Sequence, residues 1–225
     1  MEEILNQISI CIERGKINSQ SPHPADMKGN DGAVELTQSA LTQNISAKDI
    51  LDKGLLAGMQ RVGEKFRDGK IFIPEVLIAA KAMSASMELL KPYFISGEIQ
   101  HKGKIILGTV AGDLHDIGKN ILRMVLEGGG WQVVDLGINV SVEKFISSLK
   151  ENDAKIVGLS ALLTTTMQNM REIVKQIKDQ FDDVFLVIGG APLSQKFADE
   201  INADAYFPDP QSMLDYIDKI YAEIR

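Results

Sequence analysis

One imidazole of this chain lies where a ligand-binding loop is expected. His115 follows the apolar run 105–110, which is typical of a buried strand, and Gly118 then begins a helical pattern. Loops at the carboxyl ends of strands bind ligands in open α/β sheets. A carboxylate beside a His, here Asp113, is the usual companion of a metal-ligating imidazole because it fixes the tautomer. The residues predict a metal ligand at His115, with a helix-capping or packing role as the alternative.

Three further strand ends carry small or polar residues. The segment 160–166 follows the third expected strand, Gly189 and Gly190 follow the fourth, and 207–210 follows the fifth. In a parallel sheet these segments lie at the same edge as the His115 loop. Hydroxyls, a glycine pair and one imidazole thus converge. This combination suits a large ligand that needs close approach to the backbone on one side and a metal ligand on the other.

Short β-rich runs alternate with helical segments from residue 104 onward. The expected strands are 104–110, 131–135, 155–160, 183–188 and 204–207, and the expected helices are 117–128, 141–151, 166–180, 193–200 and 210–223. Because parallel strands need helical crossovers, this alternation predicts a Rossmann-like, flavodoxin-like five-stranded parallel α/β domain. The expected strand order 2-1-3-4-5 places the switch point between the first and third strands.

The first hundred residues have a helical period instead. Apolar residues at spacings of three and four predict helices near 1–14, 32–43, 46–67 and 75–94, which together form a four-helix bundle. Ser46 is the expected N-cap of the third helix, and Pro74 suits the first turn of the fourth. A polar loop, expected to be mobile, covers about 16–31. The predicted domains are a helical cap at 1–95, a linker at 96–103 and an α/β domain at 104–225.

Composition argues against several classes of protein. The 225-residue chain has a net charge of -7, which disfavours a nucleic-acid partner. No apolar run approaches the roughly 18 residues of a membrane span. The acidic start of the chain does not resemble a secretory signal, so a soluble cytoplasmic protein is expected. The single Cys11 lies in an apolar helical pattern and is expected to be buried.

The motifs resemble a known family. Asp113-x-His115-x-x-Gly118, Ser160-x-Leu162 and Gly189-Gly190 are similar to the fingerprint of domains that bind cobalamin base-off/His-on. The chain resembles both the cobalamin module of methionine synthase and the corrinoid proteins of methanogen and acetogen methyltransferase systems. Segments 58–66 and 69–74 resemble the helical cap of those proteins. The resemblance covers about residues 45–215, and the segment 16–31 departs from it.

The resemblance implies a cofactor and a role for each motif. The cofactor is cobalamin (methylcobalamin or a related corrinoid), with His115 as the lower axial ligand of cobalt and with Asp113 and Thr166 as a proton relay. Phe66 and Ile73, with Met59 as their neighbour, cap the upper face and shield a bound methyl group. The remaining implied contacts with the cofactor are Gly112, Leu114, Asp116, Ile117, Gly118, Ser160, Leu162, Thr164, Gly189 and Gly190, of which Ser160, Leu162, Thr164, Gly189 and Gly190 line the channel for the nucleotide tail.

Simpler structural roles stay open for several residues. The run 164–166 could be an N-cap cluster, and Phe66 and Ile73 could belong to the core of the bundle. The glycines 128–130 are expected to end a helix. The first-turn residues Asp116 and Lys119 are expected to be solvated, as are the linker residues His23 and His101.

The implied function is that of a carrier rather than a catalyst. The chain would shuttle a methyl group between a substrate-specific methyltransferase and an acceptor methyltransferase of thiol or tetrahydrofolate type, with a reductive activator as a third partner. It would be a non-catalytic subunit of a corrinoid-dependent demethylase system. Methanol, methylamines, betaines and aryl methyl ethers all remain possible donors.

Other functions need features that this sequence does not show. A cobalamin-dependent regulator or light sensor would add a DNA-binding domain, and a mutase subunit would need a catalytic barrel. A receiver-like signalling domain would need a phosphorylatable Asp after the third strand, where this chain has Ser160.

Overall fold

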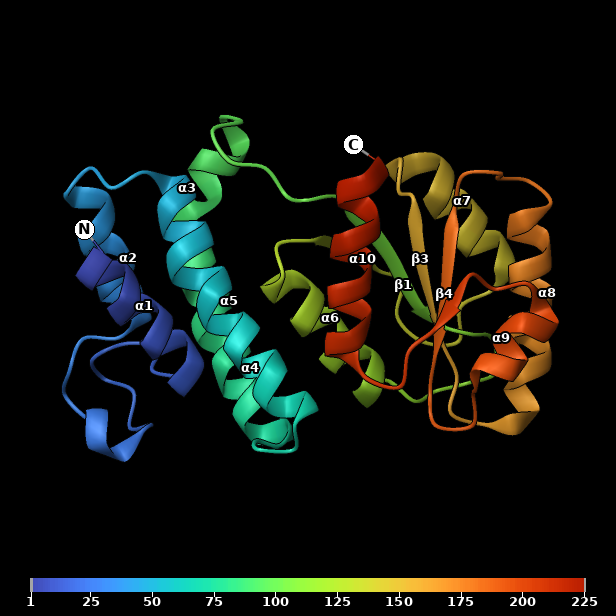
Figure 1. The fold of residues 1–225 in the computed structure, drawn as a ribbon, viewed down its shortest axis with the longest axis horizontal. Helices are drawn as coiled ribbons and strands as arrows, with labels where there is room; N and C mark the ends of the chain where they lie inside the picture. Colours follow the sequence, from blue (N-terminus) through green and yellow to red (C-terminus); the bar gives the residue numbers. More distant parts are fainter. Residues whose placement is uncertain (1, 225) are drawn as a thin grey trace. The chain divides into compact units, whose positions relative to one another are not determined.

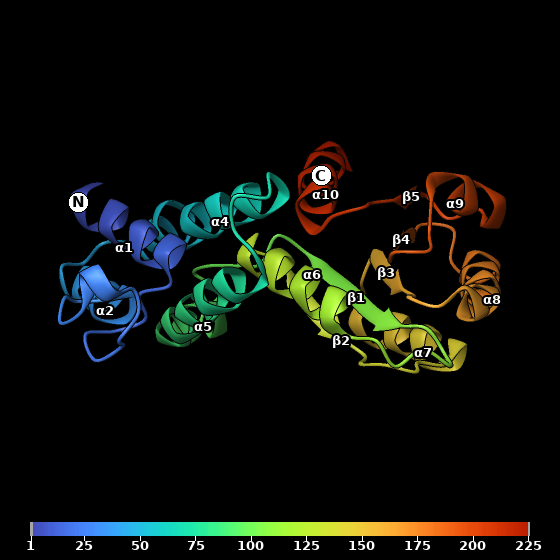
Figure 2. The ribbon, with the colours of Figure 1, turned by 90° about the horizontal axis from the view of Figure 1, so that it is seen from below.

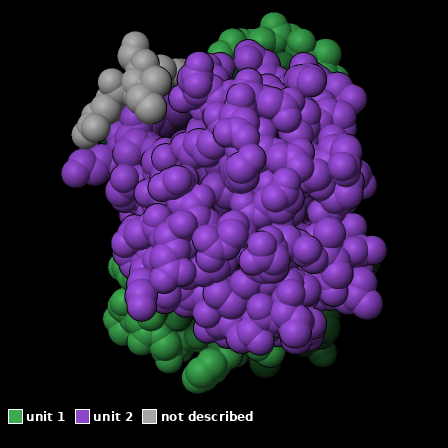
Figure 3. Space-filling view, turned by 90° about the vertical axis from the view of Figure 1, so that its right-hand side faces the viewer, with its two compact units in different colours: residues 1–101, 128–130 green, residues 102–127, 131–225 purple. Residues whose placement is uncertain are grey.

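The computed structural model describes residues 2–224, which form two compact units. The first unit extends to residue 101 and includes 128–130, and the second comprises 102–127 and the chain from 131 onward (Figure 3). The narrower domain limits expected from the sequence, 1–95, 96–103 and 104–225, stay a prediction. No helix within the described residues combines the length and the apolar character that crossing a bilayer requires.

The first unit is a bundle of four helices, as predicted (Figure 1). Its third helix is not uniform, because a π-helical segment separates α3 from α4 where the sequence predicts a continuous α-helix. Ser46 caps α3, since its Oγ accepts a hydrogen bond from Asp49 N at 3.1 Å. The elements are α1 (Glu2–Arg14), α2 (Ala33–Thr42), α3 (Ala47–Asp49), the π-helical segment (Ile50–Leu56), α4 (Ala57–Arg67) and α5 (Ile73–Ile95).

The polar segment 16–31 is tied to the bundle by hydrogen bonds. Lys16 is fully buried and donates to the carbonyl of Ser21 at 3.0 Å. Ser19 N donates to Glu35 of α2 at 3.0 Å. A short 3-10 turn (Ala25–Met27) completes the segment. The expected loop is therefore present, but it is a bonded loop and not an unstructured one. Cys11 is buried as predicted, and its burial raises the pKa of the thiol to about 11.

The second unit contains the predicted parallel sheet. The strand order is β2-β1-β3-β4-β5, and every pair is parallel. Thr109 of β1 pairs with Ser160 of β3, and Ser160 pairs with Gly189 of β4, so three strand ends lie in register. The strands are β1 (Lys104–Thr109), β2 (Gln132–Asp135), β3 (Ile156–Ser160), β4 (Phe185–Gly189) and β5 (Ala205–Tyr206).

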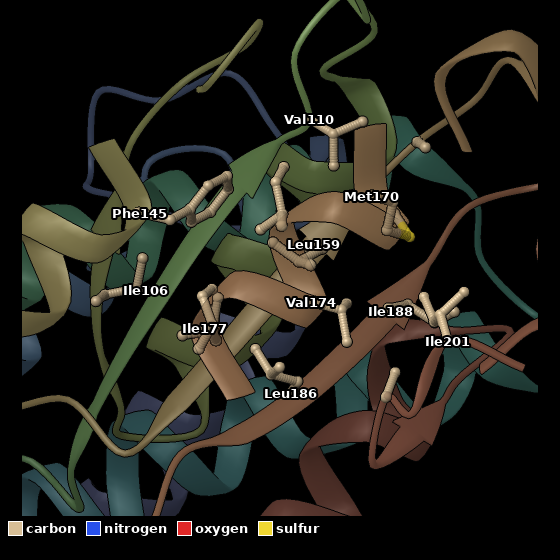
Figure 4. Packing of buried hydrophobic residues seen from close by; sticks show 14 of the residues in the cluster. Ile106, Val110, Phe145, Leu159, Met170, Val174, Ile177, Leu186, Ile188 and Ile201 are labelled. Atoms are coloured by element: carbon tan, nitrogen blue, oxygen red, sulfur yellow. The ribbon is translucent and has the colours of Figure 1, made fainter. Parts of the chain in front are cut away.

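Helices cover both faces of this sheet (Figure 2). One face packs Ile106 and Leu159 against α7, α8 and α9, through residues such as Phe145 (Figure 4). The other face packs Ile105 and Val187 against α6 and α10. The helices are α6 (Ile117–Gly128), α7 (Val142–Asn152), α8 (Met167–Lys178), α9 (Gln195–Ile201) and α10 (Pro210–Ile224). The α6 helix ends at the predicted glycine stop.

Two glycines let α1 approach the third helix of the bundle. A Cβ on Gly58 would lie 2.6 Å from the carbonyl oxygen of Ser9 and 2.7 Å from Cβ of Ile12. A Cβ on Gly54 would lie 3.0 Å from a terminal methyl of Ile8. The first obstacle includes backbone, which cannot rotate away, whereas the second is a side-chain methyl at a longer distance.

Gly58→Ala should therefore loosen the contact between α1 and α4. We expect a loss of about 1–3 kcal/mol from overpacking, set against a helix-propensity gain of about 1 kcal/mol. Hydrogen exchange of the α1 amides measures this locally. Gly54→Ala is the matched control and should change that exchange less. Equal exchange in both variants would contradict the assignment.

Candidate functional site

The carboxylate of Asp113 joins two loops at the carboxyl edge of the sheet. The side chain is fully buried. Its Oδ1 accepts hydrogen bonds from His115 N at 3.1 Å and from His115 Nδ1 at 2.7 Å. Its Oδ2 accepts from Leu162 N at 2.7 Å, Leu163 N at 3.1 Å and Thr166 Oγ1 at 2.9 Å. One carboxylate thus holds the β1–α6 loop against the β3–α8 loop.

These donors keep Asp113 ionised. Burial alone would raise the pKa of this carboxyl, but hydrogen bonds from Leu162 N, His115 and Thr166 hold the pKa well below its usual range. An ionised carboxylate only accepts hydrogen bonds. The ring nitrogen Nδ1 of His115 must therefore carry a proton, which assigns Nε2 as the nitrogen that can bind a metal.

The backbone of the His115 loop is held from its other side by the loop after β2. Asn139 N donates to the carbonyl of Asp113 at 3.0 Å, and Gly112 N donates to Asn139 Oδ1 at 2.7 Å. Thr109 Oγ1 donates to the carbonyl of His115 at 2.9 Å. Gly112 has φ +81°, a conformation that favours glycine. The site residue is thus fixed through its main chain as well as through its ring.

Large apolar side chains are exposed in the three loops that meet at Asp113. The side chain of His115 is 50% exposed among them. Scattered exposed apolar residues are ordinary, but a group of them on adjacent loops indicates a surface for a ligand or a partner. The residues are Leu114, Ile117, Ile138, Leu162 and Leu163, exposed by 67%, 66%, 42%, 42% and 41%.

Small residues leave space on one face of the sheet near this edge. Leu159 and Ile188 point into the core under α7, α8 and α9, so their neighbours Ser160 and Gly189 face the side of α6 and α10. Ser160 and Gly189 are paired in register. A Cβ on Gly189 would meet only the carbonyl oxygen of Phe207, at 3.6 Å. There is therefore room beside Gly189, one of the residues that the family resemblance places along a channel.

Gly190 has a different role. It has φ +137°, and a Cβ would lie 1.9 Å from the carbonyl oxygen of Ala161. The backbone here packs directly on the start of the β3–α8 loop, the loop that binds Asp113. Gly190 is therefore needed for close packing, whereas Gly189 contributes space.

The threonine run does not act as a set of side-chain caps. Thr164 is exposed and begins a 3-10 turn (Thr164–Thr166). Thr166 occupies the N-cap position of α8, but its side chain makes no capping bond and instead binds Asp113. The hydroxyl of Thr166 also lies 2.8 Å from the carbonyl oxygen of Leu163. The structure thus resolves the capping alternative for Thr166.

The predicted residues of the helical unit lie at one end of it. Phe66 is half-buried near the end of α4, and Ile73 is 38% exposed at the start of α5. Met59, about two helical turns before Phe66, is buried. Phe72 was not predicted, although it is 67% exposed at the same turn. Its position next to Ile73 in the sequence could have indicated that Phe72 belongs to the same apolar surface.

Two residues that the sequence predicts to be exposed to solvent, Lys119 and His101, are not. Lys119 is 3% exposed, because its ammonium group pairs with the carboxylate of Asp135. His101 is half-buried with its ring stacked on Phe94 at a centroid distance of 4.4 Å, and burial lowers the pKa of that imidazole. Asp116 and His23 are exposed as expected.

Comparisons with known protein families give two matches. A B12 binding domain model matches residues 103–213, and a second B12 binding domain model matches 30–91. The chain is 41% identical to trimethylamine corrinoid protein 1 of Methanosarcina acetivorans, over 84% of this chain and 88% of that protein.

Two solved structures are similar to the chain. One is the methanol:cobalamin methyltransferase complex of Methanosarcina barkeri, with a TM-score of 0.83, 28% identity, and coverage of 98% of this chain and 80% of that one. The other is a cobalamin-binding protein of Desulfitobacterium hafniense, with a TM-score of 0.73, 30% identity, and coverage of 96% and 97%.

Thr166→Val should weaken the second unit, because a buried carboxylate loses one donor. We expect a loss of about 1–3 kcal/mol in the free energy of unfolding. Urea titration followed by the fluorescence of Trp131 reports on this unit. The exposed neighbour supplies the control: Thr165→Val should stay within about 0.5 kcal/mol of wild type. Thr166→Ser keeps the hydroxyl and should be more stable than Thr166→Val. Equal stability of these two variants would show that the hydroxyl is not the cause of the loss.

Gly190→Ala should be more damaging than the same change at Gly137. Gly137 has φ +86° but nothing within 4 Å of a built Cβ, so Gly137→Ala tests the backbone conformation alone. We expect about 1–2 kcal/mol for that strain, and a further loss of about 1–3 kcal/mol at Gly190 from the contact with Ala161. The same urea titration measures both, and equal losses would show that the contact is unimportant.

Proposed function

This chain belongs to the family of B12-binding corrinoid proteins, and from that premise we propose that it carries methyl groups within a cobalamin-dependent methyltransferase system. Cobalamin is its cofactor. The observation that carries the proposal is His115, which is half-exposed at the carboxyl edge of the sheet and held through Nδ1 by the buried Asp113.

The residues at this edge fit the cofactor. Nε2 of His115 would bind the cobalt ion of the corrin ring, since Asp113 fixes the tautomer that leaves this nitrogen available. The flat macrocycle needs an apolar surface, and Leu114, Ile117 and Leu162 supply exposed apolar side chains there. Gly112 and Asp116 lie in the same exposed loop, and Gly118 lies in the exposed first turn of α6, where backbone can approach the ring closely.

The open face beside Ser160 and Gly189 would take the nucleotide tail of a base-off cofactor. Ser160 offers a hydroxyl, and the missing side chain of Gly189 offers space. Leu162 and Thr164 would lie along the entrance, since both are exposed on the β3–α8 loop. Gly190 would shape the channel indirectly, through its packing on Ala161.

When bound, cobalamin supplies a cobalt ion that accepts and donates a methyl group. The chain's own contribution is to hold and release the lower ligand. Asp113 keeps the proton at Nδ1 of His115, and Thr166 donates to the other carboxylate oxygen. This pair would act as the proton relay that compensates the change in charge when the imidazole binds or leaves the metal.

The helical unit would protect the methyl group. Phe66 and Ile73, with Met59 behind them, present apolar surface at one end of the bundle, and Phe72 adds to it. An apolar cover excludes water from a reactive metal centre. The partners would be a substrate-specific methyltransferase, an acceptor methyltransferase of thiol or tetrahydrofolate type, and a reductive activator.

Replacing His115 by Gly should leave the corrinoid bound but change its visible spectrum, because cobalt loses its lower nitrogen ligand. Titration of the cofactor-free protein with hydroxocobalamin, followed by absorbance, measures both binding and ligation. His23→Ala is the control, since His23 is exposed in the other unit. A His115→Gly spectrum equal to that of wild type would refute the ligand assignment, and failure of the wild-type chain to bind any corrinoid would refute the function.

A further inference from the structure

Lys119 is a buried cation in the first turn of α6, four residues after His115. Its side chain is 2% exposed. Its Nζ donates to Oδ1 and Oδ2 of Asp135 at 2.7 Å each and to Oδ1 of Asn120 at 2.9 Å. A buried ion pair is weak evidence for stability, because desolvation offsets the attraction, and its best-attested use is to fix one arrangement of the chain.

The partner carboxylate leads directly to the backbone of the site. Asp135 is the last residue of β2, and its Oδ1 also accepts a hydrogen bond from Gly137 N at 2.9 Å. The carbonyl of Gly137 accepts from Thr109 N at 3.0 Å. Thr109 Oγ1 in turn donates to the carbonyl of His115 at 2.9 Å. A continuous series of short contacts therefore connects Lys119 to the main chain of His115.

The loop after β2 also holds the beginning of the His115 loop. Asn139 binds both Gly112 and Asp113 through the bonds described above. The His115 loop thus rests on residues 137–139 at its start and centre. Lys119 follows the end of the His115 loop in the sequence. Its bond to Asp135 ties that end to residues 137–139 as well, because Asp135 also binds Gly137.

We propose that the Lys119–Asp135 ion pair is a positioning device, which keeps the His115 loop in its ligand-ready conformation before any cofactor is present. The expected effect of this ion pair on cobalamin binding rests on the proposed function, whereas its effect on the order of the loop in the cofactor-free protein does not. Each effect can therefore be disproved without the other.

Apolar packing adds little to the hydrogen bonds that hold this loop. Leu114 and Ile117 are exposed, and a Cβ on Gly118 would meet nothing within 4 Å. Without the pair, the cofactor would have to order the loop on binding, and that cost would appear as lost affinity. Groups outside the ligand shell that orient a metal ligand typically contribute roughly 10- to 100-fold to metal affinity, and Lys119 acts on His115 in this way through Asp135 and the loop after β2.

The same unit contains a second Lys–Asp pair at the amino ends of the strands, which is less buried, since the side chains of Lys178 and Asp204 are 30% and 28% exposed. Lys178 Nζ donates to Oδ1 and Oδ2 of Asp204 at 2.8 and 2.6 Å, and to the carbonyl of Val184 at 3.3 Å. Val184 and Asp204 precede β4 and β5, so this pair lies at the amino ends of the strands. Lys178→Met therefore removes similar chemistry without touching the His115 loop.

Hydrogen exchange of the cofactor-free full chain tests the first part. In Lys119→Met, peptides covering 111–118 and 135–140 should exchange at least about tenfold faster, while peptides of β3 and β4 keep wild-type rates. Lys178→Met should leave both loop peptides unchanged. Unchanged exchange of 111–118 in folded Lys119→Met would overturn the proposal. Should that variant not fold, Asp135→Asn removes the charge with little change of shape and must give the same result.

Titration with hydroxocobalamin tests the second part. Lys119→Met should bind roughly 10- to 100-fold more weakly than wild type, and at saturation a smaller fraction should show the histidine-ligated spectrum. Lys178→Met should match wild type in both respects. Wild-type affinity and spectrum in Lys119→Met would overturn the positioning role, even if its stability had fallen. Failure of every variant, wild type included, to bind a corrinoid would overturn the proposed function and leave the exchange result standing.

Discussion

The site depends on one buried carboxylate that carries a charge and is surrounded by hydrogen-bond donors. Such a group is costly to bury unless its oxygens are satisfied, and Asp113 meets this condition with donors from two separate loops. Charge-assisted hydrogen bonds are the stronger ones, so each donor is held firmly in place. The position of the imidazole is therefore set by the same interaction that joins β1 to β3 at their carboxyl ends.

The sheet order makes this interaction available. After β1 the chain turns to α6 on one face, whereas after β3 it passes to α8 on the other. Loops that diverge in this way leave a crevice between neighbouring strands, which is where open α/β sheets bind ligands. Asp113 spans the base of that crevice, and His115 stands at its rim. A different neighbour for β1 would leave the carboxylate without its donors from Leu162 and Leu163.

Much of this arrangement could be predicted from the sequence, because strand and helix periods are local and strong. The strands, their order and the proximity of Asp113 to His115 follow from such patterns. The burial of Lys119 does not, since a first-turn lysine is ordinarily solvated and its partner lies on another strand. The π-helical segment within the third helix has the apolar spacing of an α-helix, and the bonded loop 16–31 depends on contacts with Glu35 that composition does not encode.

The two carboxylates that support the site, Asp135 and Asp113, differ in the groups that bind them. Asp135 is neutralised by the ammonium group of Lys119, which holds the pKa of that carboxyl below its usual value against the effect of burial. No such cation is bonded to Asp113 among the described residues, and its donors are neutral groups and the imidazole. The carboxylate beside Nδ1 of His115 therefore keeps its negative charge without a bonded lysine or arginine. A carboxylate paired with a lysine suits a structural support, whereas a carboxylate bonded to the imidazole and to neutral donors suits the group that raises the basicity of a metal ligand.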